Sequence, residues 1–343
     1  AWKQSLLGEA AHSFKLPYVS TLLDLIKAFD SVPFDCLADC AKRLGYNLFL
    51  LRLSIASYSI ARVLDVEGCC SVMIWASRGL AAGSVLATIE LRILLLEVSD
   101  RVVALSIYTR LTLYVDDATL ETVCTARRVV SEHVGVVNLF TSGLQDLRMT
   151  FSDTKNVVCA SSSCIASEVA DSLTGIVVSA ASRVTSLGAG LGAGARRNMK
   201  QMSKRLKAFK ARRQRFQMLR RWGVKTSRIL RTGGISAMTY GQRALGVADS
   251  VLMHQRRAAA SSTAVSTCGA NLDITLLLAD EHCIGAADPA FEAHVGVVHN
   301  WALAVWEQWA PQFLLSHLVS SAKCRIEKSH AKWNVVCGPA AAL

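Results

Sequence analysis

The sequence lacks the features that mark membrane and secreted proteins. None of its 343 residues falls in a run of about 18 uncharged apolar positions, and the nearest candidate, residues 49–64, is interrupted by Arg52 and Arg62. We therefore expect no membrane partner. The first residues show no signal-peptide pattern and no initiator Met, so we expect the chain to begin inside a longer reading frame.

Cysteines at zinc-binding spacing are also missing. The chain has 11 Cys, an odd number at irregular spacing, and no C-x2-C pair that could start a zinc site. A mixed group, His282-Cys283 with His294 and His299, matches no zinc pattern, so ordinary core and surface positions are the simpler interpretation. Free thiols in this number fit a reducing compartment, which predicts an intracellular protein, nuclear or cytoplasmic.

The composition excludes a disordered chain. Hydrophobic residues make up 52% of the sequence and the mean hydropathy is +0.32, which indicates extensive burial. The length is sufficient for two or three domains.

The positive charge is concentrated in one segment. The net charge is +12, yet residues 196–231 contain 15 Lys or Arg and no Asp or Glu, which leaves about −3 for the rest of the chain. An apolar seam at spacings of three and four residues runs through this segment, at Met199, Met202, Leu206, Phe209 and Phe216. The pattern favours a helix packed on one side and facing a polyanion on the other; a solvated cationic helix is the alternative.

Periodicity predicts a mixed chain before this segment. Helices are expected at residues 2–14, 33–44, 47–61, 84–98 and 131–147. Strands are expected at 19–25, on both sides of Asp116-Asp117 within 111–123, at 176–178 and 183–185, and in a hairpin over 62–75 that turns at Glu67-Gly68. Beyond about residue 232 the sequence is Ala/Ser-rich and helical in character.

Three carboxylates carry the most specific chemistry in the sequence. Asp24 stands at the exit of a predicted strand, and Asp116 and Asp117 stand in a predicted hairpin turn. Brought together, they would form an all-oxygen set suited to Mg²⁺, with two such ions serving an in-line phosphoryl displacement. Asp-Asp is also common in turns for backbone reasons.

These residues occur within a series of motifs. The segments 23–30 (LDLIKAFD), 78–84 (RGLAAGS) and 114–117 (YVDD) follow one another in the order of motifs A, B and C of reverse transcriptases, and the chain resembles that family, particularly its non-LTR retroelement and group II intron branch. Segments 152–155 and 186–188 resemble motifs D and E. The resemblance covers roughly residues 15–230.

The resemblance implies a role for each matched residue. Asp24, Asp116 and Asp117 would hold two Mg²⁺ ions, with Mn²⁺ as a possible substitute, and Lys155 would act near the triphosphate as a catalytic residue. The residues that would bind the substrate are Phe29, Gly79, Gly83, Ser84 and Tyr114. Nucleic-acid binding would fall to Arg196, Arg197, Lys200, Lys204, Lys207, Arg212, Arg213 and Arg215. The plainer alternatives are a core aromatic for Phe29, a solvated lysine for Lys155 and an ordinary turn for the glycines.

The expected fold class is α+β: a right-hand polymerase palm, with a four-stranded antiparallel sheet backed by helices, then a mostly helical thumb and C-terminal region. The expected domains are residues 1–195 (palm with a remnant of the fingers), 196–265 (basic thumb) and 266–343 (helical extension). The implied function is RNA-directed DNA polymerase, with an RNA template, a DNA primer and dNTPs as partners.

Two departures from the family pattern support an alternative, a catalytically inactive nucleic-acid-binding remnant. Ala81 and Ala82 replace the Pro and Gln that are usual in motif B, and only 23 residues precede Asp24, too few for the fingers motifs. A polymerase that makes RNA is disfavoured by Tyr114 and the bulky Phe29.

Overall fold

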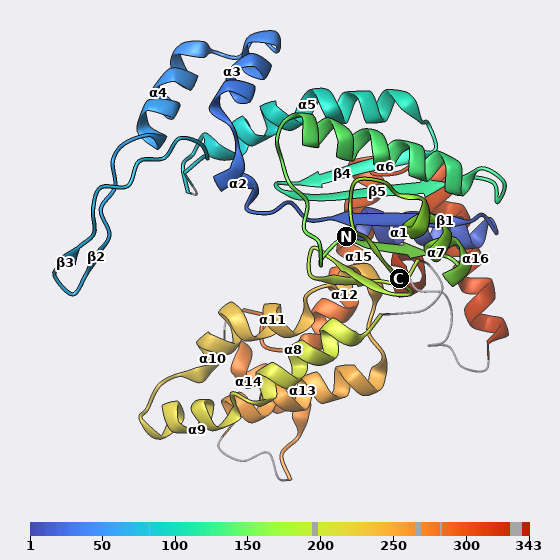
Figure 1. The fold of residues 1–343 in the computed structure, drawn as a ribbon. Helices are drawn as coiled ribbons and strands as arrows, with labels where there is room; N and C mark the ends of the chain where they lie inside the picture. The colour runs from blue at the N-terminus through green and yellow to red at the C-terminus, as the bar shows by residue number, and fades with distance from the viewer. Residues whose placement is uncertain (82, 194–197, 265–268, 282, 330–337) are drawn as a thin grey trace. The chain divides into compact units, whose positions relative to one another are not determined.

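The computed structural model describes residues 1–81, 83–193, 198–264, 269–281, 283–329 and 338–343 (Figure 1). It divides into two compact units: one is Val19–Ala181, and the other combines Ala1–Tyr18 with Ser182–Leu343. The first unit contains a mixed sheet covered by helices and the second is mainly helical, so the α+β class is confirmed. No helix in the described ranges is long and apolar enough to cross a membrane.

A five-stranded sheet organises the unit 19–181. The strand order is β4 (Thr109–Tyr114), β5 (Asp117–Val123), β1 (Tyr18–Leu23), β6 (Val157–Ala160) and β7 (Ser179–Ala181). β4 pairs antiparallel with β5, and β1 pairs antiparallel with β6 with Thr21 opposite Val158. The strands are rich in Val, Leu and Thr, which suits a sheet that is buried on its central strands.

The expectation of a four-stranded, wholly antiparallel sheet was wrong. β6 and β7 run parallel, with Val158 opposite Ala180. Helix α7 (Ser163–Ser172) lies between them in sequence and provides the crossover that a parallel pair requires. The predicted strand at 176–178 is correspondingly displaced to Ser179–Ala181.

Two long helices cover the sheet. α5 (Ala87–Leu105) and α6 (Val129–Asp146) lie side by side over β4 and β5 (Figure 1). Leu94 of α5, Phe140 of α6 and Leu120 of β5 are fully buried in one core. Each such side chain stabilises the fold by about 1.5–3 kcal/mol relative to an exposed one.

Shorter elements complete this unit. They are α2 (Ala28–Ser31), α3 (Phe34–Arg43), α4 (Leu48–Tyr58), β2 (Asp65–Val66) and β3 (Cys69–Cys70). The hairpin β2–β3 turns at Glu67 (φ 52°) and Gly68 (φ 82°), so the predicted turn is confirmed. Two consecutive residues with positive φ are typical of a two-residue hairpin turn whose twist matches that of its strands.

A buried histidine ties α6 to the sheet. His133 is fully buried; its Nε2 lies 2.6 Å from Thr21 Oγ1 of β1, and its Nδ1 lies 2.7 Å from Thr122 Oγ1 of β5. Thr122 Oγ1 is in turn 2.7 Å from Thr109 Oγ1 of β4. Burial lowers the pKa of His133 to about 3, so the ring is neutral and bridges strands through hydroxyl groups.

This depressed pKa predicts acid sensitivity. The unfolded chain binds a proton at His133 below pH 6.5 and the folded chain does not until about pH 3. The free energy of unfolding should therefore fall by about 1.4 kcal/mol per pH unit below pH 6.5. Urea unfolding between pH 7 and 4 measures this, and the His133→Gln variant, whose amide cannot titrate, should lose that part of the slope. Equal slopes for both proteins would contradict it.

The second unit brings the first helix against the last ones. α1 (Trp2–Ser13) contacts α16 (Gln312–Lys328) and α17 (Pro339–Ala342), and the Trp2 ring lies edge-on to Trp301 and Trp309 at 5.9 and 5.3 Å. Helix α1, which the sequence analysis placed with the palm in residues 1–195, thus belongs by its contacts to the unit of the C-terminal helices. Trp2 and its partners in these helices form a core of their own.

Glu9 of α1 is a buried acid in this core. Its carboxylate accepts the backbone N–H groups of Ala340 and Ala341, each at 2.9 Å. Burial raises the pKa of Glu9 to about 7, although these two hydrogen bonds and the nearby Arg325 act in the opposite direction. The Glu9 carboxyl group thus links α1, near the start of the sequence, to α17, near its end.

The rest of this unit is a small hairpin and a set of helices. The hairpin is β8 (Val184–Ser186) with β9 (Ala189–Leu191). The helices are α8 (Lys200–Lys210), α9 (Arg213–Arg221), α10 (Thr226–Ile229), the π-helical turn η1 (Leu230–Gly234), α11 (Ile235–Thr239), α12 (Gln242–Leu245), α13 (Asp249–Thr263), α14 (Leu272–Asp280) and α15 (Pro289–Trp306).

The apolar seam of the basic segment is confirmed. Met202, Leu206, Phe209 and Phe216 are buried, and Met199 is half-buried. Phe209 and Phe216 pack with their ring centroids 5.5 Å apart. The cationic residues between them are left on the outside of α8 and α9.

Candidate active site

The acidic hairpin turn is tight and strained. Tyr114 pairs with Asp117, so only Val115 and Asp116 make the turn between β4 and β5. Val115 has φ 60°, at a position where such turns favour Gly. A β-branched residue in this conformation costs about 1–3 kcal/mol, and such strain gathers at functional sites. Tyr114 is 62% exposed beside the turn.

Asp24 is held at the end of β1 by its backbone. Its N–H donates to Asn156 Oδ1 at 3.0 Å, and its C=O accepts the N–H of Ser152 at 2.9 Å. Asn156 is buried, and its Nδ2 donates to Ser152 O at 2.6 Å and Val177 O at 3.1 Å. Asn156 therefore fixes the loop after Ser152 against β1; sequence analysis missed this residue, for which proximity to Lys155 was the one available signal.

Lys155 reaches the first of the three carboxylates. Its Nζ lies 3.1 Å from Asp24 Oδ2, with Lys155 67% and Asp24 30% exposed. A pair this exposed contributes about 0–1 kcal/mol to stability. The contact places a largely exposed cation beside Asp24.

The structure brings the three predicted carboxylates into one electrostatic cluster. β5, which begins at Asp117, is the neighbour of β1, after which Asp24 follows. Burial raises the pKa of Asp117, the negative charges of Asp116 and Asp24 raise it further, and Lys155 opposes them. The acids therefore repel one another and are incompletely neutralised by the lysine.

The donor chemistry of this cluster fits a hard divalent cation. All its side-chain ligands are carboxylate oxygens, which Mg²⁺ prefers, and a cation would relieve the repulsion at Asp117. Asp24, Asp116 and Asp117 are the residues that would hold it. Across the described part of the chain, no three His, Cys, Asp or Glu side chains converge closely enough to form a ready-made metal group.

The chain matches no known protein-family model, and no curated protein is detectably similar to it in sequence. The geometry of the chain itself therefore carries the functional argument.

Segments 23–30 and 78–84 lie directly against each other. Leu80 N–H donates to Phe29 O at 2.7 Å, and Gly79 N–H donates to Val32 O at 2.8 Å. Phe29 is half-buried and packs on the main core, which agrees with the core-aromatic alternative while leaving part of the ring accessible. A Cβ at Gly79 would lie 2.7 Å from Asp30 O, so only glycine fits this approach.

Replacing Gly79 should cost stability. Gly79→Ala places a Cβ against backbone and forces φ 96° on an L-residue, so the free energy of unfolding should fall by about 2–4 kcal/mol. Gly83→Ala is the matched control, because Gly83 has φ 94° with nothing within 4 Å of the added Cβ. Urea unfolding of both variants measures the difference. Equal losses would show that the close approach to Asp30 carries no penalty.

Ser84 belongs to a chain of hydrogen bonds that sequence analysis missed. Its Oγ lies 3.0 Å from the hydroxyl of Tyr58, which donates to Glu90 Oε2 at 2.7 Å. Tyr58 and Glu90 are buried. These residues come from α4 and α5, and no local pattern in the sequence indicates that they meet.

The predicted nucleic-acid-binding residues that the structure describes are all exposed: Lys200, Lys204, Lys207, Arg212, Arg213 and Arg215. Arg196 and Arg197 lie outside the described residues. In the described ranges none of the six forms an ion pair with an acid. Burial lowers the pKa of Arg220, and the neighbouring positive charge of Arg213 lowers it further.

The segment 186–188 forms the turn of the hairpin β8–β9. Leu187 has φ 47° and Gly188 φ 74°, and Tyr240 donates its hydroxyl to Leu187 O at 2.9 Å. Arg205 of α8 stacks on the Tyr240 ring at 4.6 Å and donates to its C=O at 3.0 Å. The turn is thereby attached to the first basic helix.

Proposed function

We propose that the chain is the palm and thumb of an RNA-directed DNA polymerase of a retroelement, which extends a DNA primer on an RNA template with dNTPs. The observation that carries the proposal is the cluster of Asp24, Asp116 and Asp117 at the ends of adjacent strands, on a strained turn and beside Lys155. In this proposal the strands β4, β5, β1 and β6 with α5 and α6 are a polymerase palm.

Each residue of the cluster has a part in nucleotidyl transfer. Two Mg²⁺ ions, when bound, would lower the pKa of the primer 3′-hydroxyl and stabilise the leaving pyrophosphate. Asp24 and Asp116 orient the reacting groups by fixing these charges, and Asp117 supports them. Lys155 is free to leave Asp24 for the triphosphate, where its ammonium group can give a proton to the leaving oxygen.

The remaining predicted residues would define the substrate pocket. Phe29 would lie under the sugar of the incoming nucleotide and exclude a 2′-hydroxyl group. Gly79 and Gly83 would allow the backbone to approach the new base pair, with Ser84 held behind it by Tyr58. Tyr114, exposed at the turn, would position the primer end.

The basic helices would form the thumb. Their exposed cations without acidic partners supply the phosphate-binding charge that a primer–template duplex requires. Their buried seam anchors them to the rest of the helical unit.

Primer extension tests the proposal. The chain is incubated with a DNA primer annealed to an RNA template, dNTPs and Mg²⁺ or Mn²⁺, and product length is followed on a gel. Extension that depends on the RNA template is the expected result. Absence of extension with both metals, under conditions where the duplex is bound, would reject the enzyme.

One alternative is favoured by a specific observation: a non-catalytic nucleic-acid-binding remnant. Lys155 pairs with Asp24, and the carboxylates of the described chain do not converge on a ready-made metal group. The remnant would bind the same duplex with strong salt dependence and extend nothing. Terbium luminescence separates the two, because an intact site would bind Tb³⁺ in the wild type and lose it in the Asp24→Asn/Asp116→Asn variant.

A further inference from the structure

A cavity of about 820 Å³ lies in the helical unit among α8, α9, α13 and α14. Its size is in the range of small-molecule sites. It is formed entirely by residues of the unit that contains Ser182–Leu343, and none of the residues assigned above to catalysis lines it.

Aromatic and aliphatic side chains make up one part of the lining. Phe209 and Phe216 contribute the 5–6% of their surface that is exposed, and Met253 and Leu272 contribute aliphatic surface. The two rings are packed against each other and held in the core, so the surface that they offer is rigid. A flat, apolar group is the natural complement to such a wall.

Cations make up the other part. Lys210, Arg213 and Arg257 line the cavity, are exposed, and form no ion pair within the described residues. His254 lies beside them in the lining. Arg213 and Arg257 come from different helices, α9 and α13, so the charges converge from two sides.

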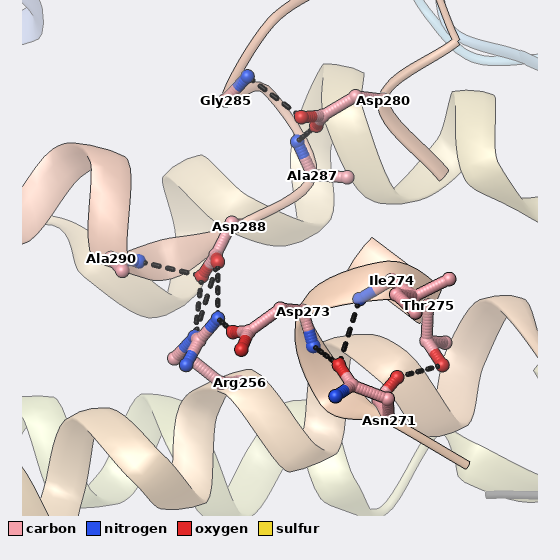
Figure 2. A network of polar contacts seen from close by, with 10 residues as sticks. All are labelled: Arg256, Asn271, Asp273, Ile274, Thr275, Asp280, Gly285, Ala287, Asp288 and Ala290. Atoms are coloured by element: carbon pink, nitrogen blue, oxygen red, sulfur yellow. Dashed lines mark hydrogen bonds and ion pairs between the residues drawn. The ribbon is translucent and has the colours of Figure 1, made fainter. Parts of the chain in front are cut away.

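The single acid in the lining is already paired with a cation. Asp273 pairs with Arg256, whose guanidinium also binds Asp288 through contacts of 2.8–3.1 Å, and Figure 2 shows the guanidinium between the two carboxylates. Asp288 caps α15 through the N–H of Ala290, and Asn271 caps α14, which fixes this arrangement in place (Figure 2). The three remaining cations of the lining have no acidic partner within the described residues.

We propose that this cavity binds a nucleoside phosphate, with the phosphate on Arg213, Arg257 and Lys210 and the base against Phe209 and Phe216. A bare phosphate would leave the apolar wall and most of the volume unfilled, and an uncharged aromatic compound would leave three cations without a partner. The same chemistry is presented by a free nucleotide and by the phosphorylated end of a nucleic-acid strand. The proposal does not depend on polymerase activity.

The test is calorimetric titration of the full chain with AMP, with inorganic phosphate and adenosine as partial ligands. AMP should bind more tightly than either. The Arg213→Gln/Arg257→Gln variant should weaken AMP binding by about tenfold or more. Lys323→Gln is the control, because Lys323 is an exposed cation of the same unit that does not line the cavity and has no role assigned above, and it should leave AMP binding unchanged.

Chemical footprinting of the wild-type chain gives a second measurement. It does not depend on whether a variant folds. AMP should slow carbethoxylation of His254 by diethyl pyrocarbonate and leave the exposed His299, outside the cavity, unaffected.

A pair of short oligonucleotides, with a 5′-phosphate or a 5′-hydroxyl, identifies the source of the ligand. Preference for AMP indicates a free nucleotide, and preference for the 5′-phosphorylated strand indicates a strand end. The proposal is overturned if neither AMP nor the phosphorylated strand protects His254. It is equally overturned if the double variant binds both of them as the Lys323→Gln control does.

Discussion

Asp116→Asn should abolish primer extension, lowering its rate by at least about 10²-fold. Asp116 stands in the turn next to Asp117, and in the proposed function its negative charge is one of three that would hold the cations of the reaction. Asparagine keeps the size and the turn preference of the side chain and removes only the charge. The loss would therefore report on electrostatics rather than on the fold.

A second readout of the same variant does not require activity. The charge of Asp116 raises the pKa of Asp117, so Asp116→Asn should lower that pKa toward its usual range, which a carbon-detected NMR titration measures. Asp153→Asn is the control, because Asp153 is exposed in the same loop region as Lys155 and belongs to no part of the cluster. If Asp153→Asn reduced extension as much as Asp116→Asn, the assignment of the acidic turn would fail.

Neutralising the basic helices should remove duplex binding. The variant Lys204→Gln/Lys207→Gln/Arg212→Gln/Arg215→Gln loses four exposed cations of α8 and α9. Each phosphate contact adds about 0.9 to the slope of log K against log salt, so the slope should fall by about 3 to 4. At 0.1 M salt this corresponds to a loss of affinity on the order of 10³-fold. Fluorescence anisotropy of a labelled RNA–DNA duplex over a salt series measures both quantities.

A matched variant distinguishes a local site from general charge. Lys15, Lys42, Arg52 and Arg92 are exposed cations on other elements, and changing all four to Gln alters the net charge by the same amount. This control should change the salt slope by less than one unit. Equal slopes for the two variants would mean that the duplex responds to total charge, and the thumb assignment would be rejected.

Local patterns in the sequence predicted much of this structure. The hairpin at Glu67-Gly68 and the acidic hairpin at Asp116-Asp117 were predicted because the residues that favour a tight turn are adjacent in the sequence. The buried seam of α8 and α9 was found because helical spacing brings residues three and four apart onto one face. The clustering of Asp24 with Asp116 and Asp117 followed from motif order, and the sheet places their strands next to each other.

Long-range partners could not be read from the sequence. The bridge of His133 to Thr21 and Thr122 joins residues that are up to 112 positions apart, and nothing near any of them indicates the contact. Strand β6 (Val157–Ala160) was not predicted, so its parallel pairing with β7 was missed as well; a run of four residues is too short for its period to be recognised. The link from Ser84 through Tyr58 to Glu90 was missed for the same reason as the histidine bridge.

The contacts of α1 are made with residues that are synthesised much later than α1 itself. Its partners Trp301 and Trp309 and its hydrogen-bonded residues Ala340 and Ala341 leave the ribosome about 300 residues later than Trp2 and Glu9. Residues 19–181 form a continuous unit and can fold during that interval. The apolar side chains of α1 stay exposed to solvent until their partners have been synthesised. We therefore expect α1 to complete its packing only after the C-terminal helices have been synthesised.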